Sequence, residues 1–173
     1  MEFHSGYRQG LSYFDLGQLE NARRVFESLV LSNPDRVEPH NALGVLFRRR
    51  GMPDEAVTEY AMAISLAESA SSGRFASSEL YNNLAIAYRE HGAFKKAEEA
   101  YRKAITLNPD FSTAYYNLGV LYDLYLDRPL EAMRCYREYQ KRAGPDPAVD
   151  VWITDLEQRT ARGTGHAVDQ PSH

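Results

Sequence analysis

The chain has 173 residues, of which 43% are hydrophobic and 25% charged, a composition typical of a folded domain rather than a disordered segment. Its 20 basic and 24 acidic side chains leave a formal net charge of −4, so charge alone recruits neither nucleic acid nor an anionic membrane. A single cysteine, Cys135, excludes a disulfide within the chain.

Helical periodicity dominates the sequence, because apolar residues recur three and four positions apart and nowhere alternate with a period of two. The expected helices span residues 4–16, 19–32, 37–50, 53–70, 76–91, 94–107, 111–125, 128–143 and 147–162. The last of them carries Val151, Trp152 and Leu156 on one side and polar residues on the other, which is typical of a helix that caps an array. We expect residues 163–173 to form a disordered tail.

One phrase recurs along the chain, an alanine followed four residues later by an aromatic residue. The pairs are Ala22 with Phe26, Ala56 with Tyr60, Ala97 with Tyr101, and Ala132 with Tyr136. The alanines are separated by 34, 41 and 35 residues (56−22, 97−56 and 132−97). A small residue followed by an aromatic one precedes each pair, as in Gly44 with Phe47 and Gly119 with Tyr122. Small residues let two helices approach closely, and large aromatic residues fill the space between them.

In period and register these motifs resemble the tetratricopeptide-repeat (TPR) family over residues 3–143. The resemblance implies an all-α, right-handed α-solenoid of four TPR helix pairs plus a C-terminal capping helix. The implied repeats are residues 3–36, 37–70, 78–111 and 112–143, and the capping helix is residues 144–162. The segments 117–126 and 151–157 look more like bacterial TPR proteins than like eukaryotic co-chaperones. Some of the bacterial proteins serve envelope or secretion assemblies.

The resemblance also places one side of each repeat's first helix on a concave groove that binds a peptide segment of another protein. The implied groove positions are Tyr7, Arg8, Leu11, Asn41, Val45, Arg48, Arg49, Asn82, Asn83, Ile86, Arg89, Tyr116, Asn117, Val120 and Asp123. Asparagine is frequent among them, and a carboxamide both donates and accepts, so it can pair with the backbone of an extended or helical guest. The arginines would favour an acidic guest. Alternatively, Arg49 and Arg89 pair with Glu90 or other neighbouring acids and bind nothing.

Self-association is a second hypothesis. Phe3, Leu11 and Phe14, with Tyr7 between them, predict an apolar N-terminal edge that a second copy could cover to give a homodimer. Alternatively, Tyr7 and Phe14 fold over the groove as ordinary aromatic residues of an amphipathic helix. These two interpretations predict different exposures for the same side chains.

The 41-residue interval exceeds the first interval by seven residues, and the excess falls within residues 70–77. A tolerated surface insertion is the simpler interpretation, and a contact of Arg74 and Phe75 with a partner is the alternative.

Catalytic and metal-binding patterns are missing from the sequence. The histidines have no ligand spacing with one another or with Cys135, and we expect His40 to be a packing residue with a satisfied ring. We therefore expect a binding module that is not an enzyme and that has no cofactor, no metal and no nucleic-acid partner. Without a signal segment or a membrane-spanning run, it should be cytoplasmic, or periplasmic if a signal segment has been removed.

Overall fold

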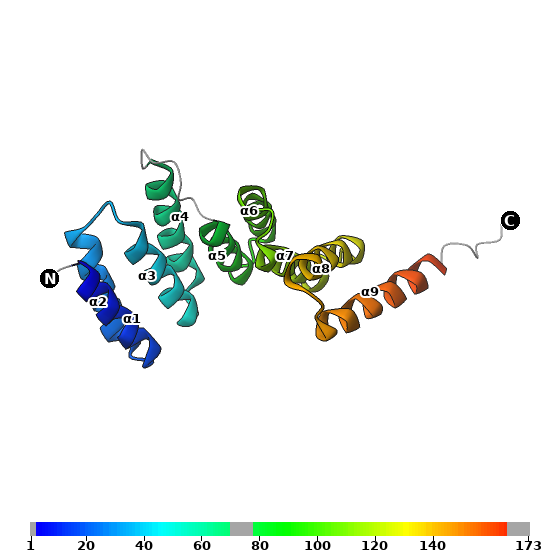
Figure 1. The fold of residues 1–173 in the computed structure, drawn as a ribbon, viewed down its shortest axis with the longest axis horizontal. Coiled ribbons are helices and arrows are strands. Elements are labelled where there is room, and N and C mark those ends of the chain that lie inside the picture. Colours follow the sequence, from blue (N-terminus) through cyan, green and yellow to red (C-terminus); the bar gives the residue numbers. More distant parts are fainter. Residues whose placement is uncertain (1–2, 70–77, 166–173) are drawn as a thin grey trace. The chain divides into compact units, whose positions relative to one another are not determined.

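A computed structural model describes residues 3–69 and 78–165 of the chain, and within these ranges every regular element is an α-helix (Figure 1). The helices are α1 (Phe3–Asp15), α2 (Leu19–Ser32), α3 (Val37–Arg49), α4 (Pro53–Ser69), α5 (Ser78–Glu90), α6 (Phe94–Leu107), α7 (Ser112–Leu124), α8 (Pro129–Ala143) and α9 (Pro147–Gly165). The predicted all-α class of paired helices is confirmed.

Two predictions about irregular segments have different outcomes. Helix α9 continues to Gly165, so the first three residues of the predicted disordered tail are helical. The remaining residues of that tail, 166–173, lie outside the described residues. The insertion at 70–77, with Arg74 and Phe75, lies outside them as well.

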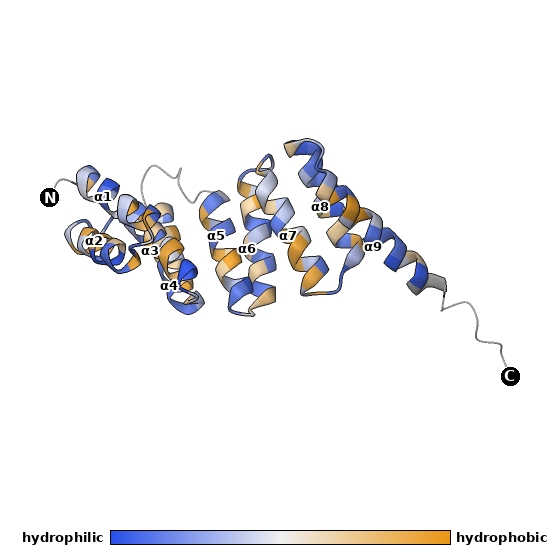
Figure 2. Ribbon diagram, turned by 90° about the horizontal axis from the view of Figure 1, so that it is seen from below, coloured by the Kyte–Doolittle hydropathy of each residue, from blue (hydrophilic) through white to orange (hydrophobic). Residues whose placement is uncertain are grey.

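The described helices form two compact units, divided between Leu107 and Asn108. In the N-terminal unit, α1 packs on α2, α3 on α4 and α5 on α6, and α2–α3 and α4–α5 contacts join the successive pairs. In the C-terminal unit, α7 packs on α8 and α8 on α9. Hydrophobic and hydrophilic residues interleave along the helices, as expected for helices that bury one side (Figure 2).

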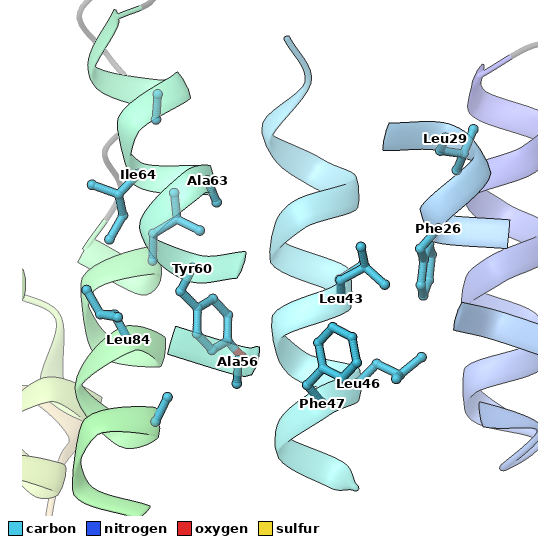
Figure 3. Packing of buried hydrophobic residues seen from close by; sticks show 14 of the residues in the cluster. Phe26, Leu29, Leu43, Leu46, Phe47, Ala56, Tyr60, Ala63, Ile64 and Leu84 are labelled. Atoms are coloured by element: carbon cyan, nitrogen blue, oxygen red, sulfur yellow. The ribbon is translucent and has the colours of Figure 1, made fainter. Parts of the chain in front are cut away.

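In three of the four pairs, close contact between a glycine and an aromatic ring joins the two helices. A Cβ atom added at Gly44 would lie 2.6 Å from Cε1 of Tyr60, and one at Gly119 would lie 2.6 Å from Cε1 of Tyr136. Both tyrosines are at most 1% exposed. Figure 3 shows Tyr60 in the core with Leu43 and Phe47 of the facing helix. The repeated motif in the sequence therefore reflects a repeated steric requirement, a small residue opposite an aromatic ring.

The turn between the paired helices differs in the fourth pair. Gly51 has a φ of 70°, a left-handed conformation that favours glycine, and Met52 N–H donates to the Phe47 carbonyl at 2.9 Å. In the fourth pair Asp127 has a φ of 48°, and Arg128 N–H donates to the Tyr122 carbonyl at 2.9 Å. The donor lies six residues after the acceptor rather than five, so the turn takes in the additional residue of this repeat.

Candidate functional site

An asparagine pair links two first helices of the N-terminal unit. Asn83 Nδ2 on α5 donates to Asn41 Oδ1 on α3 at 3.4 Å, and both side chains are partly exposed. This contact uses one donor and one acceptor, so the amide N–H groups of Asn41 and the carbonyl oxygen of Asn83 remain available to a ligand. We call the sides of α1, α3 and α5 that carry the predicted groove positions the first-helix face. On α1 these positions are Tyr7, Arg8 and Leu11.

An ion pair joins the same two helices about two turns further along. The Arg48 guanidinium donates to Glu90 through Nε at 3.0 Å and Nη2 at 2.8 Å. It also lies near the hydroxyl of Tyr60, where burial raises the pKa to about 12 and the guanidinium opposes part of that rise. Because Glu90 balances its charge, Arg48 does not add positive charge for a guest, contrary to the prediction.

The alternative interpretation, in which Arg49 pairs with a neighbouring acid, does not hold among the described residues. The Arg49 guanidinium lies 4.8 Å from the centroid of the Phe14 ring, and its Nη1 donates to the Phe14 carbonyl at 3.1 Å. Arg8, on α1, is exposed, and within the described residues neither arginine forms an ion pair. The two predicted groove arginines without an acidic partner among the described residues, Arg8 and Arg49, therefore lie on or beside α1.

A small apolar pocket opens between α1 and α3. Its volume is about 110 Å³. The lining residues are Tyr7, Leu11, Phe14, Phe26, Asn41, Ala42 and Val45. Sequence reasoning placed five of these residues at groove or edge positions, but it missed Phe26 and Ala42. Phe26 belongs to the second helix of its pair and reaches the pocket because Gly10 carries no side chain in front of it.

The predicted apolar N-terminal edge is largely covered by the chain itself. Phe3 stacks on Tyr7 with ring centroids 5.8 Å apart, and the Arg36 guanidinium lies 4.4 Å from the Phe3 ring centroid. Phe3, Tyr7 and Phe14 are partly buried against the core, whereas Leu11 is 39% exposed. The aromatic residues thus fold inward, as the alternative interpretation expected. Formation of a homodimer stays a prediction.

The remaining groove positions of the N-terminal unit differ in exposure. Asn82 is only 4% exposed, which contradicts its predicted role as a residue that meets a guest. Ile86 and Arg89 are partly exposed. Asn82 and Asn83 are neighbours on α5 but point in different directions around the helix, so one is buried and the other is partly exposed. The repeat positions alone did not distinguish them.

Two of the four predicted groove positions of the C-terminal unit, Tyr116 and Asp123, contact α9. Tyr116 lies 5.9 Å from Trp152 and 5.3 Å from Tyr139 between ring centroids. Asp123 accepts from Arg159 Nη1 at 3.0 Å, and its side chain is 11% exposed. Tyr116 and Asp123 are therefore engaged by the chain's own helix, while Asn117 and Val120 are partly exposed.

The sequence contained an unused signal for this arrangement. Thr154 follows Gly119 by 35 residues (154−119), so α9 continues the repeat register as another first helix. Its Val149 and Leu156 are at most 1% exposed and correspond to Pro39 and Leu46 of α3, which are also fully buried. A comparison of α9 with the earlier first helices would have shown that it presents residues to α7, as Trp152 does to Tyr116 and Arg159 does to Asp123.

His40 has a structural contact and is not a candidate ligand. His40 Nδ1 lies 2.7 Å from Glu59 Oε2 and is 8% exposed as a residue, which confirms its predicted packing role. In the described ranges, no three side chains of His, Cys, Asp or Glu are grouped as a metal ion would require. No described helix combines the length and the apolar character needed to cross a membrane.

Comparison with known proteins gives consistent matches. Three family profiles, each described as tetratricopeptide repeat, match residues 4–36, 35–110 and 82–148. The type IV pilus assembly protein PilF of Pseudomonas aeruginosa is 28% identical over 85% of this chain and 56% of its own length. The human protein O-mannosyl-transferase TMTC3 is 32% identical over 68% of this chain and 14% of its own length. The chain thus spans only part of these relatives.

Solved structures agree at the level of the fold. A crystal structure of MamA superposes with a TM-score of 0.77 at 22% identity, covering 88% of this chain and 84% of that one. The structure of P. aeruginosa PilF superposes with a TM-score of 0.76 at 22% identity, covering 92% of this chain and 69% of that one. At these identities the likeness establishes the arrangement of helices and nothing about ligands.

Proposed function

Because this chain belongs to the tetratricopeptide-repeat family, we propose that it holds a peptide segment of a partner protein on its first-helix face. The family fold and its relatives support a role in protein interaction or assembly, and the proposed segment is the finer step. The P. aeruginosa relative is named for type IV pilus assembly and another, Ycf3, for photosystem I assembly, so a role in assembling a complex is consistent with the proposal.

The asparagine pair carries the proposal. A peptide backbone presents donors and acceptors whatever its side chains are, and Asn41 and Asn83 offer both kinds of group from adjacent helices. Each carboxamide is fixed on a rigid helix, so little conformational freedom is lost on binding. A guest that pairs with both groups would replace the long Asn41–Asn83 contact by shorter hydrogen bonds.

Selection from a displayed library of random peptides, followed by calorimetry, tests the proposal. We expect Asn41→Ala and Asn83→Ala each to lower the affinity for a selected peptide by about fivefold, which corresponds to the loss of one ordinary hydrogen bond. Asn21→Ala is the matched control, because Asn21 lies on α2 and donates to Gln18. If the affinity of every selected peptide is unchanged in both groove variants, the first-helix face is not the binding site.

A further inference from the structure

We propose that the pocket between α1 and α3 anchors one aliphatic side chain of the guest, and that a carboxylate of the same guest pairs with Arg8 or Arg49. This inference rests on the proposed function and adds the chemistry of the segment. The guest residue would be leucine, isoleucine, valine or methionine, with aspartate or glutamate beside it.

The size and lining of the pocket select an aliphatic group. An apolar cavity of about 150 Å³ holds a benzene molecule, whereas this pocket measures about 110 Å³. A branched aliphatic side chain therefore fits, and an indole ring does not. Leu11, Phe14 and Val45 supply carbon surface, so each buried methylene should strengthen binding by roughly fourfold.

Water is a poor occupant of this pocket. A stable water molecule needs two to four polar partners, but only Asn41 and the hydroxyl of Tyr7 bring polar side-chain atoms to the lining. Burial, with a smaller contribution from Glu38, raises the pKa of the Tyr7 hydroxyl, which is consistent with a dry wall. Displacement of poorly held water by an aliphatic group is favourable.

The arginines near the pocket differ from the other arginines of the same region. Arg36 pairs with Glu38 at 3.3 Å and Arg50 pairs with Glu20 at 2.7 Å, and Arg48 pairs with Glu90. Arg8 and Arg49 have no such partner among the described residues.

The positions of these two arginines set where the carboxylate of the guest would lie. Arg8 precedes Leu11 by three residues and Arg49 follows Val45 by four, so each lies one helical turn from the lining. The Arg49 fork is also held in place on the Phe14 ring, which suits paired hydrogen bonds to a carboxylate.

Asn41 connects the pocket to the proposed grip on the backbone. It lines the pocket and also accepts from Asn83. A guest residue whose side chain enters the pocket would place its own backbone amide near these carboxamides. The side chain would then set which residue binds at this point, while the asparagines tolerate any sequence around it.

Short synthetic peptides with one central residue X between two aspartates provide the test. We expect the peptide with leucine at X to bind at least tenfold more tightly than those with alanine or tryptophan. Replacement of both flanking aspartates by lysine should weaken binding by about tenfold. Calorimetry gives the affinities, and the methyl resonances of Leu11 and Val45 should shift with leucine peptides. Equal affinity for leucine and alanine would overturn the inference, as would failure of all these peptides to bind at millimolar concentration.

Two substitutions in the pocket, Val45→Phe and Leu11→Ala, test its role, and Val120→Phe on α7 is the control. Val45→Phe should fill the pocket and abolish the preference for leucine, and Val120→Phe, at the equivalent position of α7, should keep it. Leu11→Ala removes one partly exposed wall and should reduce the preference without disturbing the core, which provides a second test if Val45→Phe folds poorly. An unchanged preference in Leu11→Ala and in folded Val45→Phe overturns the inference.

Different results would overturn the carboxylate contact, the aliphatic anchor and the proposed function. Arg8→Gln with Arg49→Gln should abolish the preference for aspartate over lysine, and Arg134→Gln on α8 should not. Binding that depends on Asn83 but shows no preference at X overturns the anchor and leaves the proposed function intact. Binding that prefers leucine but does not depend on Asn41 or Asn83 overturns the backbone grip and supports the pocket.

Discussion

Helices α3 and α7 carry equivalent residues, yet their surroundings differ. Val45 follows Gly44 on α3 and lines an open pocket, whereas α7 has Asp123 and Tyr116 in contact with α9. Both helices make the same close contact with a tyrosine of their partner helix. The repeat thus specifies how a pair folds, and the neighbouring helix decides whether its first-helix residues stay available.

An ion pair at equivalent positions shows the same contrast in another form. Arg48 of α3 pairs with Glu90 of α5, and Asp123 of α7 pairs with Arg159 of α9, with the two charges exchanged. The first pair joins two helices of complete repeats. The second fastens a single helix, α9, which has no paired second helix among the described residues.

The largest expected effect comes from enlarging the shared small residue. Gly44→Leu and Gly119→Leu should each destabilise their unit by about 3 kcal/mol, because a side chain there overlaps the tyrosine ring. Thr154→Leu is the matched control, since Thr154 stands at the equivalent position of α9 and is exposed. Urea unfolding followed by circular dichroism measures the change. Equal losses in all three variants would show that α9 is packed like a complete repeat.

A smaller effect is expected from loosening α9. Trp152 contacts Tyr116 and Tyr136 with centroid distances of 5.9 and 5.6 Å, and it is partly exposed. Trp152→Ala should therefore cost about 2 kcal/mol, below the range for a fully buried tryptophan. The Tyr116 ring protons should then show altered NMR shifts, while Val45 methyl shifts stay in place. Changed shifts at Val45 would contradict the independence of the two surfaces.

The fold was predictable because the pairs obey local rules. A glycine against an aromatic ring in three of the pairs, an aromatic residue four positions after alanine in all four and a turn residue in the left-handed conformation all lie close together in sequence. The site was only partly predictable, since Asn41 and Asn83 were identified but the burial of Asn82 was not. Arg49 on Phe14 and Arg159 on Asp123 join positions 35 and 36 residues apart (49−14 and 159−123), and repeat positions alone do not specify such partners.

Exchange of the charges in the two ion pairs should have a still smaller effect. Arg48→Glu or Glu90→Arg alone should cost about 1 kcal/mol, and the double exchange should recover most of it. The same cycle at Asp123 and Arg159 should give a smaller coupling energy, because Arg159 makes one hydrogen bond to Asp123 whereas Arg48 makes two to Glu90. Urea unfolding at low and high salt measures both cycles. A larger coupling for the second pair would show that α9 is held mainly by charge.

The smallest expected effect is an unchanged signal. Trp152 is the only tryptophan of the chain and lies against α7 and α8, so its emission reports the C-terminal unit. A guest held only on the first-helix face should leave the emission maximum in place at saturation, while it shifts the Val45 methyl resonances. A shift of the emission instead would mean that the guest contacts or displaces α9. Tyr116 and Asp123 would then belong to the binding surface after all, and the contrast between the two units would describe only the unbound chain.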